Sequence, residues 1–187
     1  KILKKIYSGS FISTHQYITT IFRPFYAPIS EIIEWVPINA KVLDIGSGTG
    51  LLLFLLQDVI GIDKSYGFDI NEKSIKIAKL VNPYKHIKFN NSNNSTTMNN
   101  ILKDINIVTM IDVLHHVPQN EKIPFLLNIL NQIPRGSQII IKDLDPLPRW
   151  MAIANRITDY FSTNSKVSYI SSNEIGQILL KNKFDIK

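Results

Sequence analysis

The stretch Val42-Leu43-Asp44-Ile45-Gly46-Ser47-Gly48-Thr49-Gly50 decides the fold of this chain. A short apolar run reaches an aspartate, and glycine then falls at every second residue. An unbroken apolar run, Leu51–Leu56, follows and predicts a buried helix. Glycine suits positions where the backbone takes a positive φ or touches a ligand, and the start of a helix presents unpaired N–H groups to an anion. The stretch therefore predicts a strand, a tight glycine turn and a helix, which is how a nucleotide-binding α/β unit begins.

The spacing of the glycines differs from that of the dinucleotide fingerprint G-x-G-x-x-G. Here the third glycine, Gly50, comes after one intervening residue, and Leu51 stands where the fingerprint has glycine. The pattern D-x-G-x-G-x-G after an apolar strand resembles motif I of the class I S-adenosylmethionine (SAM) dependent methyltransferases. The alternative is an ordinary glycine-rich turn. It is disfavoured because three of the eight glycines in the chain fall in register with the aspartate.

The resemblance implies an α/β fold with a three-layer, doubly wound, mostly parallel sheet of the Rossmann-like methyltransferase type. It also implies SAM as the cofactor and S-adenosylhomocysteine as its product. The cofactor-binding residues implied in this stretch are Asp44, Gly46, Ser47, Gly48 and Gly50.

The composition sets outer limits on the protein. Its 187 residues suffice for one α/β domain, and 44% hydrophobic with 19% charged residues is typical of a soluble globular protein. The absence of cysteine excludes disulfides and thiolate chemistry and fits a reducing compartment, so we expect a cytoplasmic protein. The net charge is +6, but the basic residues are dispersed and form no stripe among aromatics, so we expect no specific nucleic-acid partner. We also expect no transmembrane segment and no signal peptide.

Residues 1–37 precede the first predicted strand, and residues 38–187 form the predicted SAM-binding domain. Apolar residues recur at helical spacing between Ile18 and Ile33, interrupted by two prolines, which predicts one or two short helices ending before Pro37. This segment is also the most aromatic part of the chain. Core packing is the favoured interpretation, and a lid over the active site is the alternative.

An acid at the end of the second strand would accept hydrogen bonds from the two ribose hydroxyls of a nucleotide. Residues 66–71 predict this strand, which reaches Asp69 and is followed by a helix over Glu72–Leu80. Asp63 has a similar apolar approach but no helix after it, so Asp69 is preferred. The resemblance places Asp69 and the following Ile70 in the cofactor site.

A third strand is predicted over Ile87–Phe89, followed by a loop rich in Asn, Ser and Thr. In the family an aspartate in this loop contacts the adenine, and the resemblance places Asn93 there. Asn90, Asn91 and Asn94 are competing positions.

The apolar run 105–111 predicts a strand buried on both faces, and it leads into Asp112-Val113-Leu114-His115-His116-Val117-Pro118. This string resembles motif IV of small-molecule SAM methyltransferases, in which Asp112 lies in the cofactor site. It does not resemble the N/D-P-P-Y/F signature of enzymes that methylate exocyclic amines of bases. A helix over residues 121–133 and a fifth strand, Gln138–Lys142, are predicted next.

Methyl transfer to a hydroxyl needs a base, and this segment offers candidates. His115 and His116 follow the fourth strand, and we expect at most one to be catalytic. His116 is placed first because it lies further toward the open edge, with His115 turned toward the following helix. Asp143 and Asp145, after the fifth strand, are rival bases or substrate contacts. No metal site is expected, since neighbouring histidine side chains should diverge.

The C-terminal region predicts two helices and a strand. The helices span Arg149–Phe161 and a segment from an N-cap at Ser171 or Ser172 to Leu180, and a further strand begins at Asn182. Because the sequence stops inside that strand, we expect either that the C-terminus is missing from this sequence or that the final strand pair is incomplete. The predicted function is O- or C-methylation of a small molecule. The alternative is a non-catalytic SAM-fold binding protein or a subunit of a larger assembly, and an oxidoreductase is disfavoured by the glycine spacing. The sequence leaves the oligomeric state open.

Overall fold

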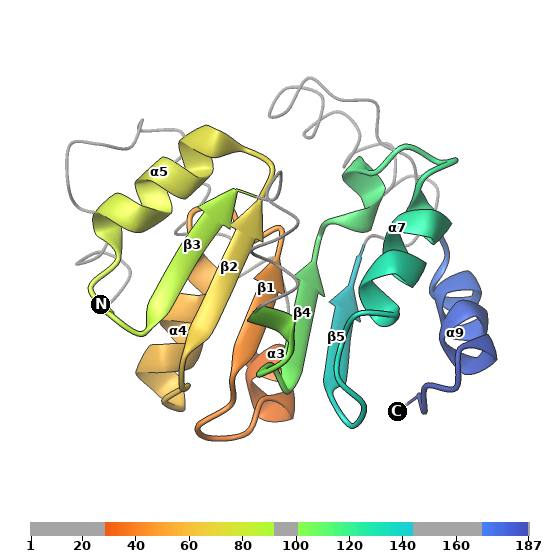
Figure 1. The fold of residues 1–187 in the computed structure, drawn as a ribbon, viewed down its shortest axis with the longest axis horizontal. Helices are drawn as coiled ribbons and strands as arrows, with labels where there is room; N and C mark the ends of the chain where they lie inside the picture. Colours follow the sequence, from red (N-terminus) through yellow and green to blue (C-terminus); the bar gives the residue numbers. More distant parts are fainter. Residues whose placement is uncertain (1–28, 92–100, 144–169, 187) are drawn as a thin grey trace. The chain divides into compact units, whose positions relative to one another are not determined.

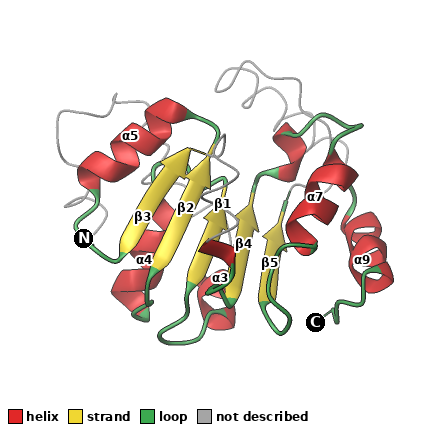
Figure 2. Cartoon of the chain, in the orientation of Figure 1, coloured by secondary structure: helices red, strands yellow, loops and turns green. Residues whose placement is uncertain are grey.

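The computed structural model describes residues 29–91, 101–143 and 170–186, in which helices and strands alternate (Figures 1 and 2). These residues fall into two compact units. The first holds the described residues up to Thr109 together with Pro134–Ile140, and the second holds Met110–Ile133 and the described residues from Ile141 onward. Each unit is described in turn.

A five-stranded sheet with the order β3-β2-β1-β4-β5 forms the centre of the first unit, and all five arrows point the same way (Figure 1). Its strands are β1 Val42–Ile45, β2 Ser65–Asp69, β3 Ile87–Asn91, β4 Ile107–Ile111 and β5 Gln138–Lys142, of which β4 and β5 each end with two residues of the second unit. Successive strands are added on one side of β1 and then on the other, which is the doubly wound arrangement. The predicted α/β fold class is therefore confirmed.

The parallel register aligns the strand ends that matter for function. Asp44 lies opposite Gly67, and Gly67 lies opposite Phe89. The fourth strand begins at Ile107, two residues later than predicted, because the N–H groups of Asn106 and Ile107 both donate to the Lys41 carbonyl oxygen as the chain enters the sheet.

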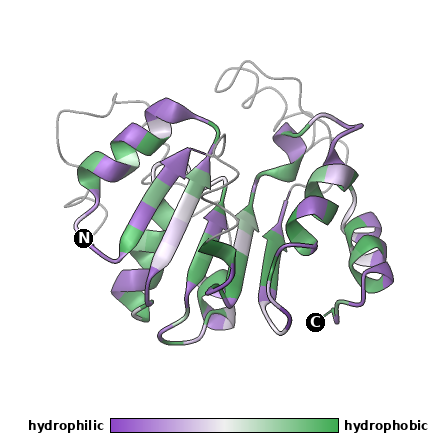
Figure 3. Ribbon diagram, in the orientation of Figure 1, coloured by the Kyte–Doolittle hydropathy of each residue, from purple (hydrophilic) through white to green (hydrophobic). Residues whose placement is uncertain are grey.

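Helices of the first unit bury apolar faces against this sheet. Helix α4, Leu51–Val59, contacts β1, and the run Leu51–Phe54 is buried, as the apolar sequence predicted. Helix α5, Glu72–Val81, packs on β2 and β3 through Ile75 and Ala78, and its other face is polar (Figure 3). Its N-cap is Asn71, whose side chain accepts hydrogen bonds from the N–H groups of Lys73 and Ser74. Helix α3, Ile29–Trp35, contacts α4 and ends before Pro37 as predicted.

The second unit contains the 3₁₀ turn η1, Leu114–His116, helix α7, Lys122–Leu130, and helix α9, Ser172–Lys181. Ser171 is the N-cap of α9, since its hydroxyl accepts a hydrogen bond from the Glu174 N–H. The prediction that a strand begins at Asn182 was wrong. Lys183 has φ 65°, and the Phe184 N–H donates to the Leu179 carbonyl oxygen. The chain therefore turns back onto the end of α9 instead of extending.

Several predicted features lie outside the described residues: the aromatic segment before Ile29, the helix Arg149–Phe161, and the residues Asn93, Asn94 and Asp145. Within the described ranges, no helix has the length and apolar character needed to cross a membrane.

Candidate functional site

The turn after β1, Gly46–Gly50, is here called the glycine turn. Gly46, Gly48 and Gly50 have φ values of 76°, 54° and 91°, a region that favours glycine. The Gly46 and Ser47 N–H groups donate to the Phe68 carbonyl oxygen at 2.7 and 3.0 Å, which ties the turn to the end of β2. Because Gly50 is the N-cap of α4, no side chain caps the first turn of that helix. Its backbone N–H groups can therefore serve an anionic ligand group.

Asp69 closes the glycine turn from the end of β2. One carboxylate oxygen accepts the Gly48 N–H at 2.7 Å, and the other accepts the Asn71 N–H at 2.7 Å. Asp63 is exposed in the loop before β2, where its own N–H donates to the Ala40 carbonyl oxygen. The structure thus brings Asp69, and not Asp63, to the glycine turn. Ile70, next to Asp69, is 76% exposed, which is high for so large an apolar side chain.

Two polar side chains are buried in and before the glycine turn. The Ser47 hydroxyl is buried and has no hydrogen-bond partner in the described part of the chain. Asp44 is only 3% exposed, and its carboxylate accepts a hydrogen bond from the Thr109 hydroxyl of β4 at 2.7 Å. Buried polar groups are normally satisfied, so the orphaned Ser47 hydroxyl fits a site that receives a polar ligand atom.

Sequence reasoning missed the support beneath the glycine turn. A Cβ placed on Gly50 would lie 2.6 Å from the Phe89 ring, and one on Gly67 would lie 2.5 Å from the same ring. Phe54 packs edge-on against Phe89 with ring centroids 5.5 Å apart. Both glycines therefore make room for one buried ring. A glycine inside a strand, as at Gly67, is the sequence signal that could have indicated such close packing.

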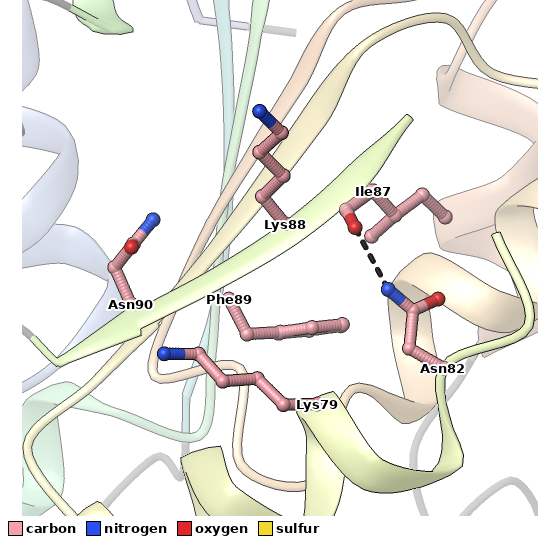
Figure 4. A pocket seen from close by; sticks show the side chains of 6 residues that line it. All are labelled: Lys79, Asn82, Ile87, Lys88, Phe89 and Asn90. Atoms are coloured by element: carbon pink, nitrogen blue, oxygen red, sulfur yellow. Dashed lines mark hydrogen bonds between the residues drawn. The ribbon is translucent and has the colours of Figure 1, made fainter. Parts of the chain in front are cut away.

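A pocket of about 290 Å³ lies beside β3 and α5 (Figure 4). It is lined by Lys79, Asn82, Ile87, Lys88, Phe89 and Asn90. The Asn82 side chain donates to the Ile87 carbonyl oxygen at 2.7 Å, the bond drawn in Figure 4, and so satisfies a carbonyl of this edge strand. Asn90, a competitor for the adenine position, lines this pocket, whereas Asn91 donates from its side chain to the Ile70 carbonyl oxygen at 3.1 Å.

The second unit holds the segment Asp112–Val117, here called the histidine turn. Asp112 directly follows β4 and has φ 57° although it is not glycine. Its N–H donates to the Lys142 carbonyl oxygen at 2.8 Å, and its carboxylate forms an ion pair with the Lys142 ammonium. Two contacts with a single residue thus hold an unfavourable backbone conformation.

His115 is buried and paired with Asp143. Its Nδ1 lies 2.6 Å from one Asp143 carboxylate oxygen, and its backbone N–H donates to the other at 3.3 Å. The two side chains are 3% and 4% exposed. His116 is exposed, and its ring centroid lies 4.0 Å from that of His115 at an interplanar angle of 46°. The expectation that the two side chains diverge was wrong, because the tight 3₁₀ turn brings the ring of His116 against the ring that Asp143 holds.

Lys122, the first residue of α7, is 1% exposed, and its ammonium donates to the Leu114 carbonyl oxygen. Burial lowers the pKa of Lys122 below its ordinary value, and the nearby Asp143 carboxylate partly opposes that shift. Sequence reasoning missed this residue and had no signal for it, since lysine is among the side chains least often buried. In the described ranges no group of three or more His, Asp or Glu side chains could hold a metal ion.

Three comparisons place the chain among known proteins. A family model described as a methyltransferase domain matches residues 38–185. A release factor glutamine methyltransferase of Fusobacterium nucleatum is 25% identical over 154 residues, which cover 78% of this chain and 42% of that protein. The chain therefore spans about two fifths of that relative.

Solved structures share the fold. A SAM-dependent methyltransferase from Archaeoglobus fulgidus superposes with a TM-score of 0.69 at 20% identity, covering 92% of this chain and 75% of that one. Magnesium protoporphyrin IX methyltransferase from Synechocystis PCC 6803, solved with bound S-adenosylhomocysteine, gives a TM-score of 0.66 at 21% identity, with coverages of 98% and 83%. At these identities the likeness establishes the architecture.

Proposed function

Because the chain belongs to the methyltransferase-domain family, we propose that it is an enzyme that transfers a methyl group from SAM to a small-molecule acceptor, on oxygen or carbon. The class I methyltransferase fold predicted from D-x-G-x-G-x-G is confirmed by the family match and the sheet order. The observation that carries the proposal is the contact between Gly48 and Asp69, which joins the glycine turn to the acid at the end of β2.

The donor and acceptor groups of the first unit suit the parts of SAM. Backbone N–H groups of the glycine turn and of the start of α4 would hold the methionine carboxylate. The Asp69 carboxylate would accept hydrogen bonds from the ribose hydroxyls, and the exposed Ile70 would pack against the adenine. The buried Ser47 hydroxyl would gain the polar partner that it lacks in the described chain. Asp44 of the first unit also belongs to the proposed cofactor-binding set. The resemblance adds Asp112 to that set and Asn93 as the proposed adenine contact.

SAM supplies a sulfonium-bound methyl group and a good leaving group, so the protein's task is alignment and, for a hydroxyl or an acidic carbon, proton removal. The proposal assigns proton removal to His116, which is exposed. The ring of His116 lies at a tilt against the ring of His115, which Asp143 holds, and this contact would keep His116 in place. Asp143 accepts the Nδ1–H of His115 in this arrangement, so the Nε2 of His115 is the second candidate for the proton acceptor.

The small-molecule assignment rests on the resemblance of Asp112–Pro118 to motif IV of small-molecule methyltransferases. The Fusobacterium relative is named for a glutamine of a release factor, but the chain covers 42% of that protein. The alternative proposal is a SAM-binding protein without catalysis, or a subunit of a larger assembly.

Calorimetry with SAM, S-adenosylhomocysteine and NAD tests the cofactor. We expect the first two to bind and NAD not to bind, and we expect Gly48→Val to abolish binding because a β-branched residue is strained at φ 54°. Asp69→Ala should weaken SAM binding by about 1–3 kcal/mol through loss of a charged hydrogen-bond partner. Asp63→Ala is the matched control and should do little. Heat from NAD alone, or a larger loss in Asp63→Ala than in Asp69→Ala, would contradict the proposal.

Turnover of labelled SAM against a panel of hydroxyl, enol and carboxylate acceptors tests the reaction. With an acceptor in hand, His116→Gln should reduce turnover while SAM affinity stays unchanged. Loss of turnover in His115→Gln alone would identify the other imidazole as the base. Full turnover in both variants would mean that catalysis relies on alignment or on Asp143 or Asp145. SAM binding without turnover of any acceptor would favour the non-catalytic alternative.

A further inference from the structure

A buried ammonium stands beside the histidine turn. Lys122 is 1% exposed, and burying a lysine is costly unless its charge is compensated. Its ammonium donates to the carbonyl oxygen of Leu114, the residue just before His115. The Asp143 carboxylate is close enough to attract it electrostatically. Both partners belong to the machinery that holds His115.

The histidine turn is thus held at two consecutive residues. Asp143 binds His115 twice, at the ring nitrogen and at the backbone N–H. Lys122 binds the preceding carbonyl group from α7. The Asp143 carboxylate and the Lys122 ammonium carry opposite charges, so each offsets part of the other's cost of burial.

We propose that Lys122 is a positioning residue, whose ammonium fixes the His115–Asp143 pair and, through it, the ring of His116 that lies against His115. This inference rests on the proposed function, because it gives the paired histidines a part in proton removal. Lys122 itself contacts the Leu114 carbonyl group and interacts electrostatically with Asp143. Its role is to keep the pair oriented and to balance the charge of the carboxylate.

The charge of Lys122 has a measurable consequence for His115. A cation beside Asp143 weakens the pull of that carboxylate on a protonated imidazole, so removing the cation should make His115 easier to protonate. Three other charged or titratable groups of this segment stay the same in a Lys122 variant: His116, whose ring contacts His115, and the paired Asp112 and Lys142. Glu121, next to Lys122 in sequence, is also unchanged. A side chain that served only as packing would leave the titration of His115 where it is.

The test is a titration of the histidine rings by ¹⁵N NMR without cofactor or acceptor. Lys122→Met should raise the titration midpoint of His115 by roughly one pH unit, the scale of one nearby charge, and should weaken the preference for the Nδ1–H tautomer. Lys122→Arg keeps the charge and should leave the midpoint close to that of the wild type. Lys103→Met removes an exposed lysine and is the control for net charge.

Lys122→Gln covers the case in which Lys122→Met does not fold, since the amide keeps a donor for the Leu114 carbonyl oxygen while the charge is lost. A folded neutral variant whose His115 midpoint and tautomer match the wild type would overturn the proposal. So would a shift of the same size in Lys103→Met. Should wild-type protein fail to bind SAM by calorimetry, the proposed function would fall, while the titration would still decide what Lys122 does for His115.

Discussion

The glycine turn and the histidine turn follow two buried strands, and each begins with a residue of positive φ, but they reach it by different means. After β1 the residue is Gly46, with φ 76°, and after β4 it is Asp112, with φ 57°. Glycine adopts this conformation freely because it has no Cβ. Asp112 is kept in it by two contacts with Lys142. The Lys142 carbonyl oxygen accepts the Asp112 N–H, and the Lys142 ammonium pairs with the Asp112 carboxylate.

The two turns also differ in the groups that they can present to a ligand. The glycine turn offers backbone N–H groups, and the Asp69 side chain reaches one of them from the end of β2. The histidine turn offers side chains, and its conformation is set by partners from elsewhere in the chain: Asp143 for His115 and Lys122 for the Leu114 carbonyl group. A site built from backbone groups depends on its own residues, whereas this side-chain site also depends on Lys122 in α7 and on Asp143 after β5.

The largest expected effect comes from filling the space at the glycine turn. Gly50→Ala should destabilise the protein by about 1–2 kcal/mol from the positive φ and a further ~1–3 kcal/mol from its clash with the Phe89 ring. Gly61→Ala is the matched control, since Gly61 has φ 72° but nothing within 4 Å of its Cβ position. Urea unfolding measures both variants. Equal losses in the two would show that Phe89 moves aside and does not define the turn.

The next effect tests how Asp44 is held before the glycine turn. Thr109→Val removes the hydroxyl that donates to the buried Asp44 carboxylate, at nearly constant volume. We expect a loss of about 1–3 kcal/mol in the free energy of unfolding, because a buried acceptor loses a partner. Thr109→Ser keeps the hydroxyl and should recover most of that loss. If Thr109→Val is as stable as the wild type, the hydrogen bond to Asp44 contributes nothing to stability. If Thr109→Ser loses as much as Thr109→Val, the packing of the threonine methyl group matters as much as the hydrogen bond.

The contrast between the turns explains how much could be predicted from sequence. Glycine at positions 46, 48 and 50 indicates a backbone with positive φ. The apolar runs before and after these positions predicted β1 and α4 within a few residues. Asp69 could be preferred over Asp63 because helix-forming residues follow it. These are local signals, which pattern and propensity carry well.

The features that sequence reasoning missed are those set by contacts that form only in the folded chain, even between residues close in sequence. Lys122 reads as a surface residue at the start of a helix, and only the folded chain places its ammonium on the Leu114 carbonyl group. The strand predicted at Asn182 has suitable apolar residues, but the N–H of Phe184 donates to the Leu179 carbonyl oxygen at the end of α9 and is not free to pair with a strand. Tertiary context overrides local propensity in the first case, and the end of the helix overrides it in the second.

A smaller effect tests whether backbone conformation or charge matters more at the histidine turn. Asp112→Ala and Asp112→Gly both remove the partly exposed ion pair with Lys142, which is worth about 0–1 kcal/mol. Alanine keeps the penalty of the positive φ, so Asp112→Ala should be less stable than Asp112→Gly by about 1 kcal/mol. Thermal and urea unfolding of the two variants give this difference. Equal stability would mean that the segment relaxes to an ordinary conformation once the ion pair with Lys142 is lost.

The smallest effect is that the two regions change the free energy of unfolding with pH in opposite directions. Beside the glycine turn, Tyr84 contacts the ring of Phe54 and donates its hydroxyl to Asp58. Burial and this hydrogen bond raise the pKa of Tyr84 to about 12 from its ordinary value of 10.0. The folded state then holds more protons than the unfolded state between these values, so the contribution of Tyr84 is complete below pH 10 and is lost as the pH rises toward 12.

Lys122 acts in the opposite direction, because its pKa in the folded protein is lowered from 10.5. Between the lowered pKa and 10.5, Lys122 is more protonated in the unfolded state than in the folded state. The free energy of unfolding therefore increases as the pH rises toward 10.5. Urea unfolding of the wild type, Tyr84→Phe and Lys122→Met at pH values from about 8 to about 11 separates the two. Relative to wild type, Tyr84→Phe should gain stability as the pH rises above 10, and Lys122→Met should lose relative stability as the pH approaches 10.5. If the stability of Lys122→Met and of the wild type changes with pH in parallel, the Asp143 carboxylate fully compensates the burial of the ammonium. If the two curves diverge with the expected sign, the cost of burying the Lys122 charge outweighs that compensation.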